Sequence, residues 1–228
     1  FLYLSPRKFP KNFLGSRYFI YLLFFFCGMK LLLCVDLHCQ VKAVESLRKK
    51  VKKEKPDLIC CSGDISIVDR GTKEMAAALD SFGKRVLIIP GNHEDEDDLE
   101  KRCHFTENLF FLHEKSYVEG NVLFLGYGTG GFSAIDSRFK RVARGFERII
   151  KANKGKKVVL LVHAPPYKTK VDNVMGSSCG NKTFKEFIVR NKPDLVVCGH
   201  LHENAGKEDF VGKTRIINPG ANGMVVEL

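Results

Sequence analysis

The sequence of 228 residues lacks several features that mark specialised classes of protein. It has no internal repeat, no long linker and no low-complexity segment. Its hydrophobic content of 44% is too high for a disordered chain and is sufficient for one substantial core. These absences exclude a repeat array and a disordered protein, and they favour a single globular domain.

Cysteine pairs spaced as in a CxxC metal motif are also absent, although the chain contains eight cysteines. Cys34, Cys60, Cys61 and Cys198 lie inside apolar runs, where a free cysteine behaves as a small buried hydrophobe. We therefore expect a protein of the reducing cytoplasm. The intracellular disulfides of hyperthermophiles are the alternative.

Acidic residues are missing from the first 28 positions, whereas four basic residues occur there. Those four are part of the net charge of +11, so +7 remains for the rest of the chain. A moderately basic domain suits an anionic substrate. The lysine-rich run at 48–56 continues a helical pattern, so we interpret it as a solvated helix face rather than a nucleic-acid footprint.

The N-terminal segment is similar to the charged and apolar regions of a signal peptide. A membrane span needs about 20 apolar residues, and this run reaches that length only by absorbing residues 30–35, which are expected to form a strand. No stable membrane span is therefore expected. Met29 looks like a natural domain start, so we expect residues 1–28 to be an extension and 29–228 to form the domain. A signal or anchor is the alternative.

From Met29 onward, short apolar runs alternate with helical patterns. The runs end in glycine, proline, aspartate or histidine, as buried strands do. They occupy residues 31–35, 57–61, 85–90, 121–128, 157–163 and 194–200. The apolar residues that recur at helical spacing are Val41, Val44, Leu47 and Val51 in 41–54, and Phe139, Val142, Phe146 and Ile149 or Ile150 in 138–153. This alternation predicts an α/β fold, and the closer strand spacing after residue 107 predicts a second sheet with hairpins.

Polar residues follow the predicted strands at the points where the strands end. These residues are Asp36, His38, Asp64, Asn92, His93, Glu94, His163, His200 and His202. Five of the seven histidines belong to this set, whereas scattered core histidines would show no preference for strand ends. Because open α/β sheets build their ligand crevices at the carboxyl ends of strands, the sequence predicts a functional site at this edge.

Two pairs of these residues have a spacing of two. In Asp36-x-His38 and His200-x-His202, both side chains point the same way while the chain is extended. We therefore expect both members of each pair to face one crevice. Taken singly, an aspartate after a strand, such as Asp64, is also an ordinary turn or helix-cap residue.

Glycines at 63, 91 and 199 are expected to permit a sharp turn after three of the strands. The imidazole, carboxylate and amide groups that follow suit borderline divalent ions such as Mn, Fe, Zn or Ni. The set is too large for one tetrahedral ion. It fits two divalent metal ions about 3.5–4 Å apart that share a bridging carboxylate.

In their order along the chain, the motifs Asp-x-His, Gly-Asp, Gly-Asn-His-Glu, an isolated His and Gly-His-x-His resemble the calcineurin-like metallophosphoesterase superfamily. The resemblance spans residues 36–202 without a missing motif. INPGANG at 217–223 is similar to the family's final NPGS segment, with Ala221 where serine is common. The chain length and HAPPYKTKVDN at 163–173 resemble small prokaryotic, archaeal-type members.

This resemblance implies a two-sheet sandwich flanked by helices, the αββα metallophosphoesterase fold, with a dinuclear metal site at the strand carboxyl ends. It implies one ion held by Asp36, His38, Asp64 and His202. It implies a second ion held by Asp64, Asn92, His163 and His200, with Asp64 bridging. His93 would face the substrate as an acid or transition-state stabiliser, with Asp64 as its orienting partner.

The implied activity is metal-dependent hydrolysis of phosphodiester or phosphomonoester bonds in a small substrate, through an activated hydroxide. A catalytically weak scaffold protein is the alternative, and a nuclease is a third. Tyr167, Lys168 and Lys170 follow His163 closely and are expected to line the substrate entrance. We interpret His104 and His113 as structural or surface residues. The sequence is compatible with a homo-oligomer.

Overall fold

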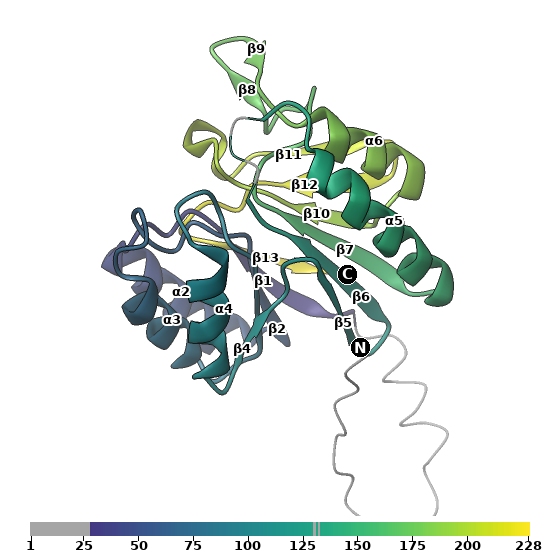
Figure 1. Ribbon diagram of the computed structural model, residues 1–228. Coiled ribbons are helices and arrows are strands. Elements are labelled where there is room, and N and C mark those ends of the chain that lie inside the picture. Colours follow the sequence, from purple (N-terminus) through teal and green to yellow (C-terminus); the bar gives the residue numbers. More distant parts are fainter. Residues whose placement is uncertain (1–27, 130, 132) are drawn as a thin grey trace, which may run out of the picture.

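The computed structural model of the protein describes residues 28–129, 131 and 133–228. Two β-sheets pack face to face, and helices cover both outer faces (Figure 1). The predicted α/β sandwich is therefore confirmed. The expectation that residues 1–28 form an extension concerns positions that, apart from Gly28, lie outside the described residues.

The first half of the chain alternates strands with helices. Its elements are β1 (Lys30–Cys34), α2 (Val41–Glu54), β2 (Leu58–Cys61), α3 (Thr72–Asp80), β3 (Val86–Ile88), α4 (Glu96–His104) and β4 (Leu109–Phe111). They form most of a five-stranded sheet with the order β13-β1-β2-β3-β4. Strands β1 to β4 run parallel, and β13 (Met224–Glu227) pairs antiparallel with β1.

The second half builds a six-stranded sheet with the order β11-β12-β10-β7-β6-β5. Its strands are β5 (Lys115–Glu119), β6 (Val122–Tyr127), β7 (Lys157–Val162), β10 (Leu195–Val197), β11 (Glu208–Val211) and β12 (Thr214–Ile217). The other elements are α5 (Ser137–Ala152), the small hairpin β8 (Asn173–Val174) and β9 (Ser177–Ser178), α6 (Lys182–Asn191) and the 3-10 helix η1 (His202–Asn204).

The predicted hairpins occur only at the two edges of this sheet. Strands β5 and β11 pair antiparallel with β6 and β12, while β6, β7, β10 and β12 are parallel to one another. The predicted second sheet with hairpins is therefore confirmed, and its centre is parallel. Helices α5 and α6 supply the crossovers that parallel strands require. The centre of the second sheet therefore consists of parallel strands joined by helices, as the first sheet does.

Three apolar layers hold the sandwich together. Leu31 and Leu33 of β1 point between the two sheets, whereas Leu32 and Cys34 point toward α2, α3 and α4. The second sheet also turns one face toward the space between the sheets, and its outer face packs against α5 and α6. Because both faces of the central strands are buried, these strands read as continuous apolar runs rather than alternating ones.

Helix α5 follows its predicted pattern, since Phe139 and Phe146 are fully buried. Helix α2 departs from its pattern at one residue. Val41 is 71% exposed, and Ala43 takes its place in the core. Val41 opens the first turn of the helix, where the chain has only begun to reach the sheet. None of the helices in the described residues is long and apolar enough to cross a membrane.

Gly145 lies inside α5, and a Cβ added there would meet no atom within 4 Å. Gly145→Ala should raise the free energy of unfolding by about 0.5–1 kcal/mol, because alanine loses less backbone entropy in a helix. Thermal unfolding would show a Tm higher by roughly 1–4 °C. Gly223→Ala is the control and should lower Tm, because its φ is 72° and its Cβ would lie 2.5 Å from Leu47 Cδ2.

Candidate metal centre

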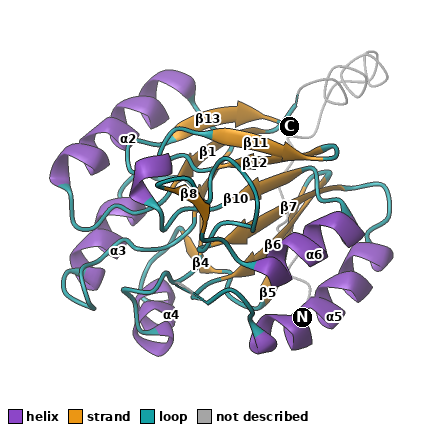
Figure 2. Ribbon diagram, turned by 90° about the horizontal axis from the view of Figure 1, so that it is seen from above, coloured by secondary structure: helices purple, strands orange, loops and turns teal. Residues whose placement is uncertain are grey.

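The loops after β1, β2, β3, β7 and β10 meet at one edge of the molecule, where the parallel strands of both sheets end (Figures 1 and 2). The predicted polar residues lie on these loops, and the structure brings their side chains into three overlapping groups. The groups are Asp36 with His38 and His202, His38 with Asp64 and His93, and Asp64 with His163 and His200. In each group the potential ligand atoms lie within 4.8 Å of one another.

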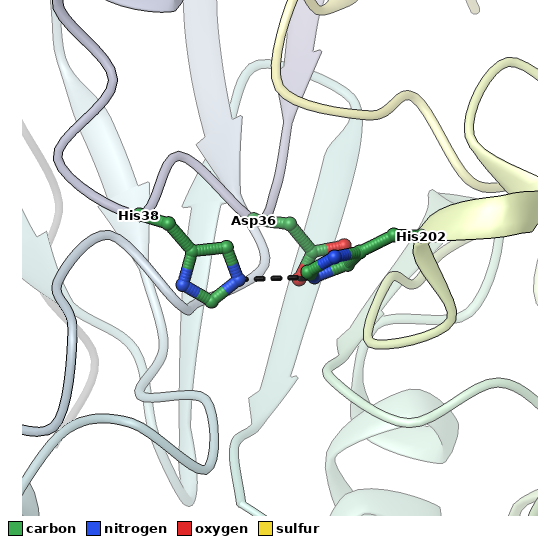
Figure 3. A group of neighbouring side chains, drawn as sticks. All are labelled: Asp36, His38 and His202. Atoms are coloured by element: carbon green, nitrogen blue, oxygen red, sulfur yellow. Dashed lines mark hydrogen bonds and ion pairs between the residues drawn. The ribbon is translucent and has the colours of Figure 1, made fainter.

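The first group joins the loop after β1 to the start of η1 (Figure 3). The Nε2 atoms of His38 and His202 are 3.0 Å apart. Asp36 Oδ1 lies 4.0 Å from His202 Nε2, and the Asp36 carboxylate also accepts the backbone N–H of His200. Asp36 is buried, whereas His202 is 60% exposed, so this group opens to solvent on the η1 side.

The third group, Asp64 with His163 and His200, lies deeper, around a fully buried histidine. His163 Nε2 is 2.9 Å from Asn92 Oδ1 and 3.3 Å from Asp64 Oδ2. The rings of His163 and His200 meet edge to face, with centroids 5.2 Å apart. Asp64 Oδ2 also lies 3.7 Å from His38 Nε2, so this carboxylate of the third group faces the first group as well.

Backbone carbonyls determine which ring nitrogens point inward. Nδ1 of His38 is 3.1 Å from the carbonyl of Ser66, and Nδ1 of His163 is 2.9 Å from the carbonyl of Ser62. A carbonyl only accepts, so each Nδ1 carries a proton and each Nε2 presents a lone pair when the ring is neutral. In their neutral forms, His38 and His163 therefore both point a nitrogen lone pair toward the carboxylate of Asp64. A cation fits such an arrangement of acceptors.

The protonation of the site without metal reflects the same crowding of acceptors. Burial opposes a charge on His163, but the carboxylates of Asp64 and Asp36 more than offset it and raise the pKa of His163 to about 9. Burial also opposes ionisation of Asp64, yet His163 lowers the pKa of that carboxyl to about 2. Burial and the charge on His163 lower the pKa of His200 to about 4. A proton on His163 occupies the position that a metal ion would take.

The extended backbone predicted for the two spaced pairs is wrong. Asp36, His38, Asp64 and His200 all have positive φ, at 56°, 41°, 51° and 69°. His202 begins the 3-10 helix. The side chains converge because each strand has already ended and the loops bend them inward, not because neighbours alternate along a strand. Non-glycine residues in this region are strained, and such strain concentrates at functional sites.

The three glycines act differently from the predicted sharp turns. Only Gly63 of the three has a positive φ, at 93°. A Cβ at Gly91 would lie 2.0 Å from Asp64 Oδ1, and one at Gly199 would lie 2.1 Å from a methyl of Val35. Gly91 and Gly199 are therefore needed for space rather than for backbone conformation.

Glu94 supports the site although the sequence assigns it no role. Its buried carboxylate accepts the backbone N–H groups of Asp64, Gly91 and Ser66 at 2.8–2.9 Å, and the Ser66 hydroxyl at 2.7 Å. It thereby joins the loop after β2 to the loop after β3. Its position in Gly-Asn-His-Glu was the only signal in the sequence, and tertiary contacts decide its role.

Asn92 and His93 point in different directions. Asn92 reaches His163, as described above, whereas the His93 ring packs edge to face on His38, with centroids 4.8 Å apart. The backbone N–H of Val68 donates to His93 Nδ1 at 3.1 Å. Asp64 Oδ1 accepts the backbone N–H of His93 at 2.9 Å. The carboxylate therefore positions the His93 backbone, and Val68 positions its ring.

Other candidate residues have contacts outside these groups. The ring of Tyr167 has the ammonium groups of Lys168 and Lys182 at 5.7 and 5.0 Å. The backbone N–H of Lys170 donates to Asp209 at 2.9 Å. His104 is exposed, and buried His113 accepts the backbone N–H of Gly128 at 2.8 Å. Both histidines thus have surface or structural surroundings, as the sequence suggests.

Gly91→Ala should weaken metal binding, because the new methyl group would displace the Asp64 carboxylate. We expect the variant to fold while the Kd for divalent metal rises at least tenfold, measured by calorimetric titration of the metal-free protein. Gly145→Ala, far from the site in sequence and free of contacts, serves as the control. Unchanged metal affinity in Gly91→Ala would show that Asp64 does not contribute to binding in this position.

Comparison with known proteins bears on the identity of this centre. Residues 29–204 match the calcineurin-like phosphoesterase family. The chain is 27% identical over 208 residues to an uncharacterized protein of Methanocaldococcus jannaschii, which covers 87% of this chain and 91% of that protein. It is 28% identical over 166 residues to a probable glycerophosphodiester phosphodiesterase of Arcobacter nitrofigilis, covering 66% of this chain and 58% of that protein.

Among solved structures, TT1561 of Thermus thermophilus has a similar fold, with a TM-score of 0.68 and 17% identity. The similarity covers 85% of this chain and 89% of that one, and at this identity it shows the shared fold alone. The family match covers most of the chain and all of the metal-ligand candidates. The resemblance drawn from the motifs is thus confirmed, and the chain belongs to the calcineurin-like phosphoesterase family.

Proposed function

We propose that the protein is a hydrolase that cleaves phosphodiester or phosphomonoester bonds of a small substrate with water as the nucleophile. The convergence of Nε2 of His38 and Nε2 of His163, which present lone pairs when their rings are neutral, on the carboxylate of Asp64 carries this proposal. Such a set of acceptors suits divalent cations, and the family supports phosphoester chemistry.

Two divalent ions, of Mn, Fe, Zn or Ni, would be the cofactors. The residues that would hold the first ion are Asp36, His38, Asp64 and His202. The residues that would hold the second are Asp64, Asn92, His163 and His200. Bound there, the pair would supply a hydroxide near neutral pH and offset charge on the phosphoryl oxygens. The carbonyls of Ser62 and Ser66 keep two of the rings in the required orientation.

His93 would act as a hydrogen-bond donor to the reacting phosphoester. Because its Nδ1 accepts the N–H of Val68, the neutral ring carries its proton on Nε2. A doubly protonated ring would lose that bond, so the contact favours transition-state stabilisation by Nε2–H over full proton delivery. The donor would act on the leaving oxygen or on a phosphoryl oxygen as negative charge develops there.

The surroundings of the site complete the proposal. Tyr167, Lys168 and Lys170 would line the approach of an anionic substrate. The free thiols of buried Cys60 and Cys198 support a reducing cytoplasm as the location. A homo-oligomer is compatible with the proposal.

The metal-loaded protein should be tested against aryl phosphomonoesters, aryl phosphodiesters and cyclic nucleotides, with metal content measured in parallel. We expect turnover of at least one class together with two ions per chain, because Asp64 faces both groups of ligands. Full metal loading without turnover of any class would favour the scaffold alternative. A stoichiometry that stays at or below one ion would contradict the two-ion site.

His93→Ala should lower kcat by about 10²–10⁴ and leave the metal content nearly unchanged. The loss should be smaller for a nitrophenolate leaving group, which departs without help, if His93 acts on the leaving oxygen. Asn92→Ala is the matched comparison and should lower metal affinity and activity together. Loss of metal from His93→Ala, or full activity on an alkyl phosphoester, would refute the assigned role.

A further inference from the structure

Several exposed apolar side chains lie on segments at the edge of the molecule that carries the metal centre. Among the described residues, eight large apolar side chains are exposed. Five of them lie on segments that follow strand carboxyl ends at this edge: Val41, Ile67, Val68, Ile135 and Met175. We call these five residues the apolar collar. Exposed apolar groups concentrated in one region mark a binding site more often than chance exposure does.

Two members of the apolar collar occupy strained turns. Val68 and Met175 have φ values of 48° and 49°, each at the tip of a tight turn. Such positions favour glycine, asparagine or aspartate, and a β-branched valine there is a steric outlier. Met175 is fully exposed, and 67% of Val68 is exposed, so neither side chain gains core contacts that would offset the strain. Backbone strain that no packing contact offsets points to a function.

The turn at Val68 is fixed to His93 through its backbone. The N–H of Val68 donates to His93 Nδ1, and the N–H of Asp69 donates to the His93 carbonyl at 2.8 Å. Ile67 and Arg70 close the turn with two backbone hydrogen bonds of 3.0–3.1 Å. The backbone of this turn is therefore held against His93, and it carries the exposed side chains of Ile67 and Val68.

The turn at Met175 is fixed from the other sheet. Asn204, two residues after His202, donates to the carbonyls of Val171 and Asn173 at 3.0 Å. The buried carboxylate of Asp172 accepts three backbone N–H groups from the same loop. The β8–β9 hairpin stands at the end of the molecule where the strands finish (Figure 1). Its base is thus rigid, and its apolar tip is presented to solvent.

We propose that the apolar collar contacts an apolar leaving group, so that the preferred substrate is an amphiphilic phosphoester, a phosphate joined to an alkyl or comparable chain. The proposal rests on the proposed phosphoester hydrolysis and adds to it that His93 donates to the leaving oxygen rather than to a phosphoryl oxygen. The acceptor groups of the centre would hold the metal ions to which the phosphate binds. Val68 and Ile67, beside His93, meet the first carbons of the leaving group, and Met175 meets the chain farther out.

The test uses n-alkyl phosphate esters from ethyl to octyl, as monoesters and as methyl alkyl diesters, with the metal-loaded full chain. The leaving alcohols have similar acidity, so a change in kcat/KM along the series reports contacts rather than reactivity. We expect kcat/KM for alkanol release to rise about tenfold or more from ethyl to octyl, since one fully buried methylene is worth up to about fourfold. Concentrations are kept below micelle formation.

Val68→Asn and Met175→Asn remove the apolar side chains without breaking the turns, because asparagine tolerates left-handed backbone. Both variants should retain their Tm and lower the octyl-to-ethyl ratio of kcat/KM several-fold. Phe210→Thr, at an exposed apolar residue of the edge strand β11, is the control and should leave the ratio unchanged.

The outcomes separate this proposal from the one on which it rests. A flat series with measurable turnover overturns the apolar collar and leaves phosphoester hydrolysis intact. Absence of turnover on these esters and on activated aryl esters overturns both. An unchanged ratio in both asparagine variants overturns the collar. A rise that begins only above micelle formation also overturns it, because the residues would then dock on a lipid surface rather than on one leaving group.

Discussion

The buried carboxylate of Asp64 is the constraint on which the site depends. It is 2% exposed and lies between the inward nitrogens of His38 and His163. A carboxylate withdrawn from water is stable only with positive charge and hydrogen bonds around it. The chain supplies the hydrogen bond through the backbone of His93, and it supplies space by keeping position 91 a glycine. The positive charge comes from a metal ion or, without metal, from protonated His163.

This constraint explains where the fold is regular and where it is not. The strands are buried on both faces, so their register is fixed by apolar packing, and they place five loops at one edge. The loops then carry the strain, since the ligand candidates Asp36, His38, Asp64 and His200 all have left-handed backbone. A rigid sandwich can hold such residues because the layers around them determine their positions.

In the proposed function, charge and apolar contact would divide the recognition of a substrate between two sets of residues. The nitrogen and oxygen groups of the metal centre would serve the phosphate. Exposed residues on turns would serve the rest of the substrate, and such residues can change without disturbing the metal-ligand candidates. Val68 connects the two sets, because its N–H orients His93 while its side chain faces outward.

The sequence by itself determined the α/β class, the positions of the six apolar strands and the family, because apolar runs and an ordered set of motifs are local features. It also identified one set of candidate metal ligands: Asp36, His38, Asp64, His163, His200 and His202. Only the tertiary structure decided how they meet. Three features depend on contacts between loops about 30 residues apart in the chain, which no local pattern records. They are the left-handed backbone of the loops, the space that Gly91 leaves for Asp64 and the hydrogen bonds by which Glu94 joins two loops. Val41 was assigned to the core and lies exposed for the same reason, since periodicity gives the face of a helix but not how far the sheet extends beneath it.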